Sequence, residues 1–266
     1  MIADIRLMAQ QLAAPSFDNP LELVTWMGAV QAQDYNMVKW ALGVRLENVT
    51  IDCVNRALQQ GEIIRTHVLR PTWHLVAAKD IRWMLKLSAQ RILSANDSFA
   101  RSHGLDITRS LYTKYNDLIG KVLEGNKSLT KQEIVQELGR VGVMIDISQL
   151  TRFMMRAEAE GIICSGVDKG NKPTYALLDE RVPKTPDLYK DEALALLARR
   201  YFQSHSPASL NDFIWWSGLS VTEAKQAVGL IEAELIMDKF ESTNLFVHET
   251  WNNLVKKDNI LHFLPS

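Results

Sequence analysis

The chain has 266 residues, of which 47% are hydrophobic and 23% are charged, and this composition excludes disordered, collagen-like and low-complexity proteins. The length suits one to three compact units. No apolar run approaches the roughly 18 residues that a membrane span needs, and the N-terminus lacks the layout of a signal peptide, so we expect a soluble cytoplasmic protein without a membrane partner.

The N-terminal third begins with an amphipathic helical segment and continues into a helix and a hairpin. The helix starts near Ile51 and ends at Gly61, since glycine commonly terminates helices. Two apolar runs, 63–69 and 72–76, are typical of strands and meet at Arg70-Pro71. This stretch therefore predicts a helix followed by a hairpin.

The middle of the chain repeats this order with a stronger start signal. Thr130 is followed three residues later by Glu133, which is a capping box that opens a helix. A second helix follows and stops at Gly161, after which the runs 162–165 and 173–178 flank a charged tip. The middle segment therefore predicts two helices and a hairpin.

The C-terminal segment shows the same order a third time. Two helical patterns are separated by Gly218, and Ser220 with Glu223 forms a further capping box at the start of the second helix. The apolar runs 235–237 and 244–248 then predict two strands joined by a polar turn.

Helices followed by a hairpin, three times along the chain, are the layout of tandem winged-helix units. The predicted fold class is mainly α with small β-hairpins (α+β), in three units at 1–95, 96–185 and 186–266. The best linker is 183–186, because its two prolines stop both helices and strands. Long helical segments fill the remaining sequence at 78–95, 106–123 and 190–204.

The net charge of −1 hides two opposed parts of the chain. Residues 1–185 carry 23 Lys and Arg against 20 Asp and Glu, whereas residues 186–266 carry 7 against 11. Residues 65–91 hold six basic residues and one acidic residue, a local +5 of the sign that phosphate contacts require. The alternative is a solvated face whose acidic partners come from elsewhere in the fold, and both interpretations stay open.

The cysteines and histidines give no sign of a metal or a disulfide. Cys53 and Cys164 each lie among aliphatic neighbours and are predicted to be buried thiols. The six histidines show no pairing. The sequence therefore implies no metal and no other cofactor.

Four segments stand in a particular order along the chain. They are Gln31-Ala-Gln-Asp-Tyr35, Trp40-Ala-Leu-Gly-Val-Arg45, Arg65-Thr66 with Arg70 to Val76, and Phe213-Ile-Trp-Trp-Ser-Gly-Leu219. Together they resemble the AlkZ-like family of bacterial winged-helix DNA glycosylases. The resemblance implies tandem winged helices whose concave surface holds duplex DNA, and hydrolysis of the N-glycosidic bond of alkylated purines, including crosslinked ones. It also implies a Gln-x-Gln or Gln-x-Asp catalytic centre, which places the catalytic residues at Gln31 and Gln33.

The chemistry of alkylated purines makes amides plausible at such a centre. Alkylation at N7 gives the purine a positive charge, so the base leaves readily and little acid catalysis is needed. Amide carbonyls can position a water and favour the oxocarbenium-like sugar without titrating. Residues i and i+2 share a face only in extended backbone, so a joint role for Gln31 and Gln33 requires the preceding helix to end near Gln31.

Several further residues receive roles from their position. The predicted DNA contacts are Arg65, Arg70, His74, Arg82, Lys169 and Lys172. For His74 a backbone hydrogen bond is an equally good prediction. The tryptophans at positions 26, 40, 215 and 216 are predicted to be core, because they lie at amphipathic spacing in helices.

Two departures from the family pattern have consequences. Pro71 stands where the family commonly has glycine, which stiffens the hairpin turn and removes a backbone donor. The chain ends at Leu261-His-Phe-Leu-Pro-Ser266, where relatives continue into a segment that completes the DNA cleft, so we expect that segment to be missing.

These observations lead to one main hypothesis and two alternatives. The main hypothesis is a DNA repair glycosylase that acts on N7-substituted purines in double-stranded DNA, located at the nucleoid. The first alternative is a non-catalytic winged-helix protein that has a DNA-binding or regulatory role. The second is a protein–protein adaptor, which the acidic C-terminal part favours. Lesion preference and oligomeric state stay open.

Overall fold

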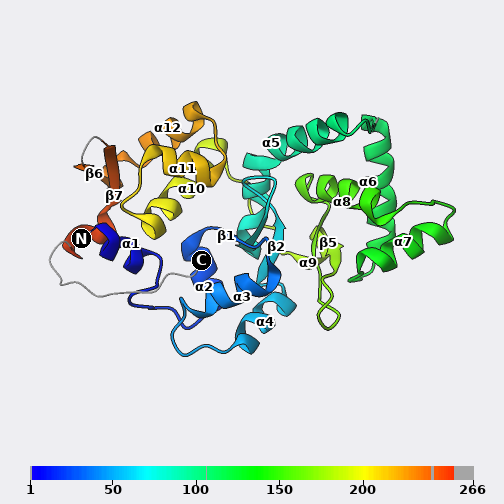
Figure 1. Ribbon diagram of the computed structural model, residues 1–266, viewed down its shortest axis with the longest axis horizontal. Helices are drawn as coiled ribbons and strands as arrows, with labels where there is room; N and C mark the ends of the chain where they lie inside the picture. The colour runs from blue at the N-terminus through cyan, green and yellow to red at the C-terminus, as the bar shows by residue number, and fades with distance from the viewer. Residues whose placement is uncertain (1, 106, 241–242, 255–266) are drawn as a thin grey trace. The chain divides into compact units, whose positions relative to one another are not determined.

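A computed structural model describes residues 2–105, 107–240 and 243–254. Helices predominate and the strands form short antiparallel hairpins (Figure 1), which confirms the predicted α+β class. The chain divides into two compact units, one made of Met1–Arg56 with Leu188–Ser266 and the other of Ala57–Asp187. Within the described residues, no helix is long and apolar enough to cross a membrane.

The first unit joins the N-terminal helices to the C-terminal part of the chain. Its elements are α1 (Ile2–Ala9), α2 (Pro20–Met27), β1 (Val30–Gln31), α3 (Tyr35–Gly43), the start of α4 (Ile51–Gln60), α10 (Lys190–His205), α11 (Leu210–Ser217), α12 (Val221–Leu230), β6 (Leu235–Phe240) and β7 (Thr243–His248). The break between α11 and α12 falls at Gly218, whose φ of 68° lies in the left-handed region that glycine tolerates. The predicted capping box of Ser220 and Glu223 opens α12. Strands β6 and β7 extend into the turn predicted at 239–243, with Lys239 paired with Asn244 and Phe240 with Thr243, and residues 241 and 242 lie outside the described residues.

An aromatic core holds the first unit together. The rings of Phe202 and Phe213 are completely buried, with their centroids 5.5 Å apart, and Phe246 of β7 packs edge-on against Phe202 at 5.6 Å. Trp26 of α2 packs against Trp251 at 6.0 Å, as the predicted core role requires. Aromatic pairs in edge and tilted arrangements add to the free energy gained from burial alone.

The second unit is built on long helices with two hairpins. Its elements are the end of α4, β2 (Ile63–His67), β3 (Trp73–Ala77), α5 (Ile81–Ser102), α6 (Arg109–Leu123), α7 (Lys131–Arg140), α8 (Ile147–Ala159), β4 (Ile163–Ser165), β5 (Tyr175–Leu177) and α9 (Leu178–Arg181). Strand β2 pairs with β3 from Ile63↔Ala77 to His67↔Trp73, and β4 pairs with β5 from Ile163↔Leu177 to Ser165↔Tyr175. The predicted hairpins are therefore confirmed.

The helix start predicted at Thr130 is confirmed in atomic detail. The Glu133 backbone N–H donates to Thr130 Oγ1 at 3.3 Å, and the Thr130 N–H donates to Glu133 Oε2 at 2.8 Å. Behind this cap, Ile134 and Leu138 of α7 pack with Leu150 of α8 in one buried cluster. The capping pattern therefore fixed both the start of α7 and the direction of its apolar face.

The two compact units of the structure do not coincide with the three units predicted from the sequence. The N-terminal helices α1 and α2 pack against α10, so the first 56 residues associate with the C-terminal part rather than with the hairpin that follows them. The boundary at Asp187 lies next to the predicted linker 183–186, which contains neither helix nor strand. The three-unit winged-helix division stays a prediction.

Gly166, at the end of β4, is a position where a larger residue does not fit. A Cβ atom there would lie 2.7 Å from both Ser128 Oγ and Thr174 Oγ1, and hydrogen bonds to the backbone of Val167 hold both hydroxyls in place. We therefore expect Gly166→Ala to lower the free energy of unfolding by about 1–3 kcal/mol, as measured by urea denaturation. The control is Gly229→Ala in α12, where no atom lies within 4 Å of the new methyl group; it should be neutral or stabilising. Equal effects of the two variants would refute the packing explanation.

Candidate functional site

The two glutamines of the Gln-x-Gln motif lie in the short segment between α2 and α3, Gln31 in β1 and Gln33 at a bend just before α3. Helix α2 ends at Met27, with Gly28 at φ 75°, and β1 covers Val30–Gln31 before Asp34 caps α3. Ala32 is completely buried while Gln31 and Gln33 on either side of it are exposed. The helix therefore ends before Gln31, as a joint role requires, and both glutamine side chains are exposed on either side of the buried Ala32.

Both glutamines line the same pocket, whose volume is about 470 Å³. This volume is in the range of small-molecule and nucleobase sites. The other lining residues come from the turn after α2 and from α3. They are Met27, Val30, Asp34, Met37, Val38, Trp40, Ala41 and Arg45.

One wall of this glutamine pocket is an exposed aromatic residue. Trp40 and Met37 lie one turn apart on α3 and are 47% and 49% exposed, so the prediction that Trp40 is a core residue is wrong. The helical spacing indicated an apolar face, but this face of α3 lines the pocket instead of packing into the interior. An exposed indole beside two amides is suited to stacking on a flat heterocycle.

Two charged residues, Asp34 and Arg45, line the glutamine pocket. Asp34 Oδ1 accepts hydrogen bonds from the backbone N–H groups of Asn36 and Met37 at 2.9 and 3.0 Å, which fixes the carboxylate at the start of α3. Arg45 donates from Nη1 to the Ala41 carbonyl at 2.7 Å, and burial lowers the pKa of its guanidinium. Asp34 belongs to the segment Gln31 to Tyr35 and Arg45 to the segment Trp40 to Arg45, but neither received a site role from the sequence.

The arrangement offers amide dipoles, one carboxylate and one guanidinium around a half-open pocket. Amide oxygens can accept hydrogen bonds from a water and can face a developing positive charge. The guanidinium of Arg45 is suited to a phosphate oxygen. The pocket therefore fits a reaction that needs orientation and electrostatic support more than proton transfer.

The predicted DNA contacts Arg65, Arg70 and His74 lie in the second unit, on the β2–β3 hairpin and its turn. The Arg65 guanidinium stacks over the Trp73 ring at 4.3 Å. Arg70 stands in the tight turn where its N–H donates to the Val68 carbonyl and its carbonyl accepts from Thr72, both at 2.7 Å. Both arginines are half-buried. The contacts with Trp73 and within the turn restrict the positions of these two side chains on the hairpin.

His74 has the backbone hydrogen bond that was the alternative to a DNA role. Its side chain is 1% exposed, and Nδ1 lies 3.0 Å from the Thr72 carbonyl oxygen. Burial lowers the pKa of His74 to about 4, and the nearby charges of Arg70 and His67 act in the same direction. A buried neutral ring is unsuited to a phosphate contact, so we leave His74 out of the proposed DNA surface.

The buried state of His74 predicts a loss of stability in acid. The unfolded ring titrates near 6.5, so between pH 6.5 and about 4 the unfolded state binds more protons and the free energy of unfolding falls as the pH falls. The slope contributed by this one group is at most about 1.4 kcal/mol per pH unit. Urea denaturation of His74→Gln, which does not titrate, should show a flatter pH dependence than the wild type. Identical slopes would contradict this role.

Arg82 and Lys169 have acidic partners within the fold. Arg82 Nη2 lies 2.8 Å from Asp179 Oδ1, and its neighbour on α5, Lys86, lies 2.5 Å from Asp187. Lys169 Nζ lies 2.7 Å from Glu133 Oε1. Part of the basic segment 65–91 therefore fits the alternative of an ion-paired face, since two of its cations meet carboxylates from the segment after α8.

Lys172 stays a candidate contact at the tip of the second hairpin. It is exposed, and its backbone pairs with Lys169 in an isolated bridge at 3.1 Å. The bridge narrows the hairpin tip and holds the two lysines side by side. The tip therefore carries two neighbouring lysines, of which Lys169 is paired with Glu133.

Trp215 and Trp216 of α11 differ in their surroundings. Trp216 is half-buried against Tyr201 at 5.0 Å, but Trp215 is 69% exposed, so its prediction as a core residue is wrong. The helix is short, and its apolar surface extends beyond the face that packs on α10. Trp215 lines a second pocket instead.

The thiols and acidic groups show no metal chemistry within the residues that the structure describes. Cys164 is buried, and desolvation raises its pKa to about 12, whereas Cys53 is half-buried with Sγ 3.6 Å from Thr50 Oγ1. No group of three His, Cys, Asp or Glu side chains in that part of the chain could hold a metal ion.

Comparisons with known proteins agree on one family. A family model described as "DNA glycosylase AlkZ-like" matches residues 24–266. The chain is 23% identical over 226 residues to an interstrand DNA cross-link repair glycosylase from Streptomyces sahachiroi, covering 82% of this chain and 60% of that protein. The solved structure of the Streptomyces sahachiroi DNA glycosylase AlkZ has a similar fold, with a TM-score of 0.77 at 21% identity over 95% of this chain and 70% of that one. The chain thus spans 60% of the length of the curated relative, and residues 261–266, which predicted a missing C-terminal segment, lie outside the described residues.

Proposed function

Since the chain belongs to the AlkZ-like DNA glycosylase family, we propose that it hydrolyses the N-glycosidic bond of N7-alkylated purines in duplex DNA, with Gln31 and Gln33 as the catalytic residues. The observation that carries this proposal is the pocket itself. Both glutamines line it from the segment between α2 and α3, together with the exposed indole of Trp40 and the half-buried guanidinium of Arg45.

Each wall of the glutamine pocket has a part in the proposed reaction. The extruded purine stacks on Trp40, while the amide oxygens of Gln31 and Gln33 orient a water toward the anomeric carbon. As the bond to the cationic base breaks, these oxygens and Asp34 face the positive charge that develops on the sugar. The water loses its proton to solvent, and the base departs as a neutral heterocycle.

The DNA surface that we propose uses cations on the two hairpins and Arg45 at the glutamine pocket. Arg65 and Arg70 stand on the β2–β3 hairpin, and Lys169 with Lys172 at the tip of the β4–β5 hairpin. Arg82 contributes only if its ion pair with Asp179 opens. Hairpins in this position after two helices are the wings of a winged-helix unit, which contact the DNA backbone.

The test is base release from a duplex that contains one N7-methylguanine, measured by mass spectrometry in the presence of EDTA. We expect free N7-methylguanine and an abasic site, with no release of guanine from the unmodified duplex. Duplex binding without release of the methylated base would leave the non-catalytic DNA-binding alternative.

The salt dependence of duplex binding separates both DNA hypotheses from the adaptor hypothesis. Phosphate neutralisation releases counterions, so the logarithm of the affinity falls linearly with the logarithm of the salt concentration. We expect a clear negative slope. A slope of zero would favour the adaptor, which the acidic C-terminal part of the chain already suggested.

A further inference from the structure

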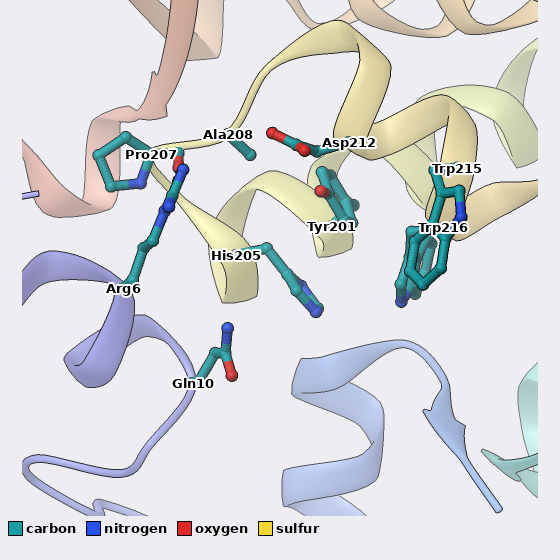
Figure 2. A pocket seen from close by; sticks show the side chains of 9 residues that line it. All are labelled: Arg6, Gln10, Tyr201, His205, Pro207, Ala208, Asp212, Trp215 and Trp216. Atoms are coloured by element: carbon teal, nitrogen blue, oxygen red, sulfur yellow. Dashed lines mark hydrogen bonds between the residues drawn. The ribbon is translucent and has the colours of Figure 1, made fainter. Parts of the chain in front are cut away.

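A second pocket in the first unit has a different character from the glutamine pocket. Its volume is about 360 Å³, and it lies between α1, α10 and α11. Figure 2 shows the rings of Trp215 and Trp216 at one end, Arg6 at the other, and His205 with Tyr201 between them. The remaining lining residues are Gln10, Pro207, Ala208 and Asp212.

The aromatic end of this pocket is a set of packed rings with one exposed member. His205 stacks on Tyr201 with ring centroids 4.7 Å apart and an angle of 12°, and Trp216 lies 5.7 Å from His205. Trp215 adds a ring that is 69% exposed. The packed rings hold the wall rigid, so a flat ligand gains stacking area at little cost in conformational entropy.

The protonation of His205 is set by its neighbours. The Ser204 hydroxyl donates to the Arg200 carbonyl at 2.7 Å, so its oxygen accepts from His205 Nδ1–H at 2.8 Å. This assigns the proton to Nδ1 and leaves Nε2 as an acceptor. Burial lowers the pKa of His205 to about 4, and Arg45 acts in the same direction, so the ring is neutral at pH 7.

Three polar side chains bring unused hydrogen-bonding groups to the pocket. Within the described residues, His205 Nε2 has no partner, and neither has the side-chain amide of Gln10. Arg6 donates only from Nε, to the Pro207 carbonyl at 2.8 Å, which aims its guanidinium and leaves its terminal nitrogens for a ligand. Asp212 is occupied by the cap of α11, where its Oδ2 accepts from Ser209.

This pocket lies next to the glutamine pocket within one unit. The Trp216 ring lies 3.6 Å from where a Cβ on Gly28 would stand, two residues before β1. Arg45 lines the glutamine pocket and also acts electrostatically on His205. Gly28, in the turn between α2 and β1, therefore lies against Trp216 of this pocket, and Val30 and Gln31 of the same segment line the glutamine pocket.

We propose that the pocket of Trp215, His205 and Arg6 binds a second nucleobase together with its phosphate. The base stacks on Trp215, an N–H on its edge donates to His205 Nε2, Gln10 pairs with the same edge, and the guanidinium of Arg6 holds the phosphate. The choice of a nucleobase as the ligand rests on the proposed function, whereas the stacking and hydrogen-bonding groups stand on the geometry alone. The pocket would thus hold a base close to the one being released, a separate role from that of the glutamines.

The test uses 2-aminopurine, whose fluorescence is quenched on stacking with an indole. The probes are its deoxynucleoside, the 5′-monophosphate, and a single-stranded oligonucleotide with one 2-aminopurine. The protein is the full chain carrying Gln31→Ala and Gln33→Ala, so that base release plays no part. We expect saturable quenching that weakens about tenfold in Trp215→Leu, since one base stack is worth that much, and about fivefold in His205→Phe, which keeps the ring but loses the acceptor.

Two further variants assign the remaining contacts. Arg6→Gln should weaken the binding of the monophosphate and leave the binding of the deoxynucleoside unchanged. The matched control is Tyr189→Leu, which removes an aromatic residue that is 81% exposed and outside the pocket, and it should leave all binding unchanged. Circular dichroism confirms that each variant is folded. Binding to Trp215→Leu equal to the parent, or equal losses in Tyr189→Leu, overturns the proposal.

The probes also separate the two sources of such a base. An oligonucleotide that binds at least tenfold more tightly than the monophosphate indicates a nucleotide within a strand, and equal affinities indicate a free nucleotide. Base release by the wild type is a separate assay. Quenching that depends on Trp215, without any base release by the wild type, would contradict only the proposed glycosylase function. Base release without such quenching would contradict only the second nucleobase site.

Discussion

Gln31→Ala and Gln33→Ala are each expected to reduce single-turnover release of N7-methylguanine by a factor of about 100 to 1,000, the typical effect of losing one oriented dipole at a reacting centre. Both amides line one pocket from exposed positions on either side of the buried Ala32, so we expect them to act on the same water and sugar. The double variant should be little slower than either single variant, because groups that act as a unit are not additive. Gln33→Asp should keep part of the rate, since the family uses Gln-x-Asp as well as Gln-x-Gln.

The control for this series is a glutamine of similar exposure that lines neither the glutamine pocket nor the pocket of Trp215. Gln132 is exposed on α7, and Gln132→Ala should leave the rate of base release unchanged. Duplex binding by the glutamine variants should also stay within about twofold of the wild type, because neither glutamine is one of the proposed phosphate contacts. A rate that falls only in proportion to binding would assign the glutamines to DNA contact instead of catalysis.

His67→Phe is expected to destabilise the protein by about 1–3 kcal/mol, the cost of leaving a buried hydrogen-bonding group without its partner. His67 Nδ1 lies 2.6 Å from Glu158 Oε2, and the Glu158 side chain is 1% exposed. Its other oxygen, Oε1, has no hydrogen-bond partner among the described residues. Phenylalanine keeps the packing on Trp73, whose ring lies 4.0 Å from that of His67, so the variant isolates the loss of the donor.

A double-mutant cycle separates this effect from a cavity or a strained ring. His67→Phe combined with Glu158→Leu removes both partners and should recover most of the lost stability, measured by urea denaturation. The exposed histidine at the end of α5 provides the comparison, and His103→Phe should change the stability by less than about 0.5 kcal/mol. A double variant as unstable as the sum of the single variants would show that the pair is not coupled.

The sequence predicted the elements of the fold well because their signals are local. The capping boxes at Thr130 and Ser220 and the breaks at Gly161 and Gly218 are short patterns whose physical basis lies within a few residues. The division into compact units was harder to predict. It depends on α1 and α2 packing against α10, a contact between residues that are far apart in the chain.

The site was predictable in part. Gln31 and Gln33 came from the family resemblance, and the end of α2 before Gln31 agrees with the role that the resemblance gives them. The exposure of Trp40 and Trp215 was not predictable, because an amphipathic pattern shows that a face is apolar and not whether a neighbour covers it. The pairing of Arg82 with Asp179 was equally hidden, since ion pairs across about a hundred residues leave no local trace.

The most direct test of this account is single-turnover release of N7-methylguanine from a duplex that the protein has already bound, comparing the wild type with the Gln31→Ala/Gln33→Ala double variant at saturating protein. The account predicts free base and an abasic site with the wild type, and intact methylated duplex with the double variant at unchanged occupancy. Equal release by the two proteins, or bound duplex from which neither releases the base, would contradict it.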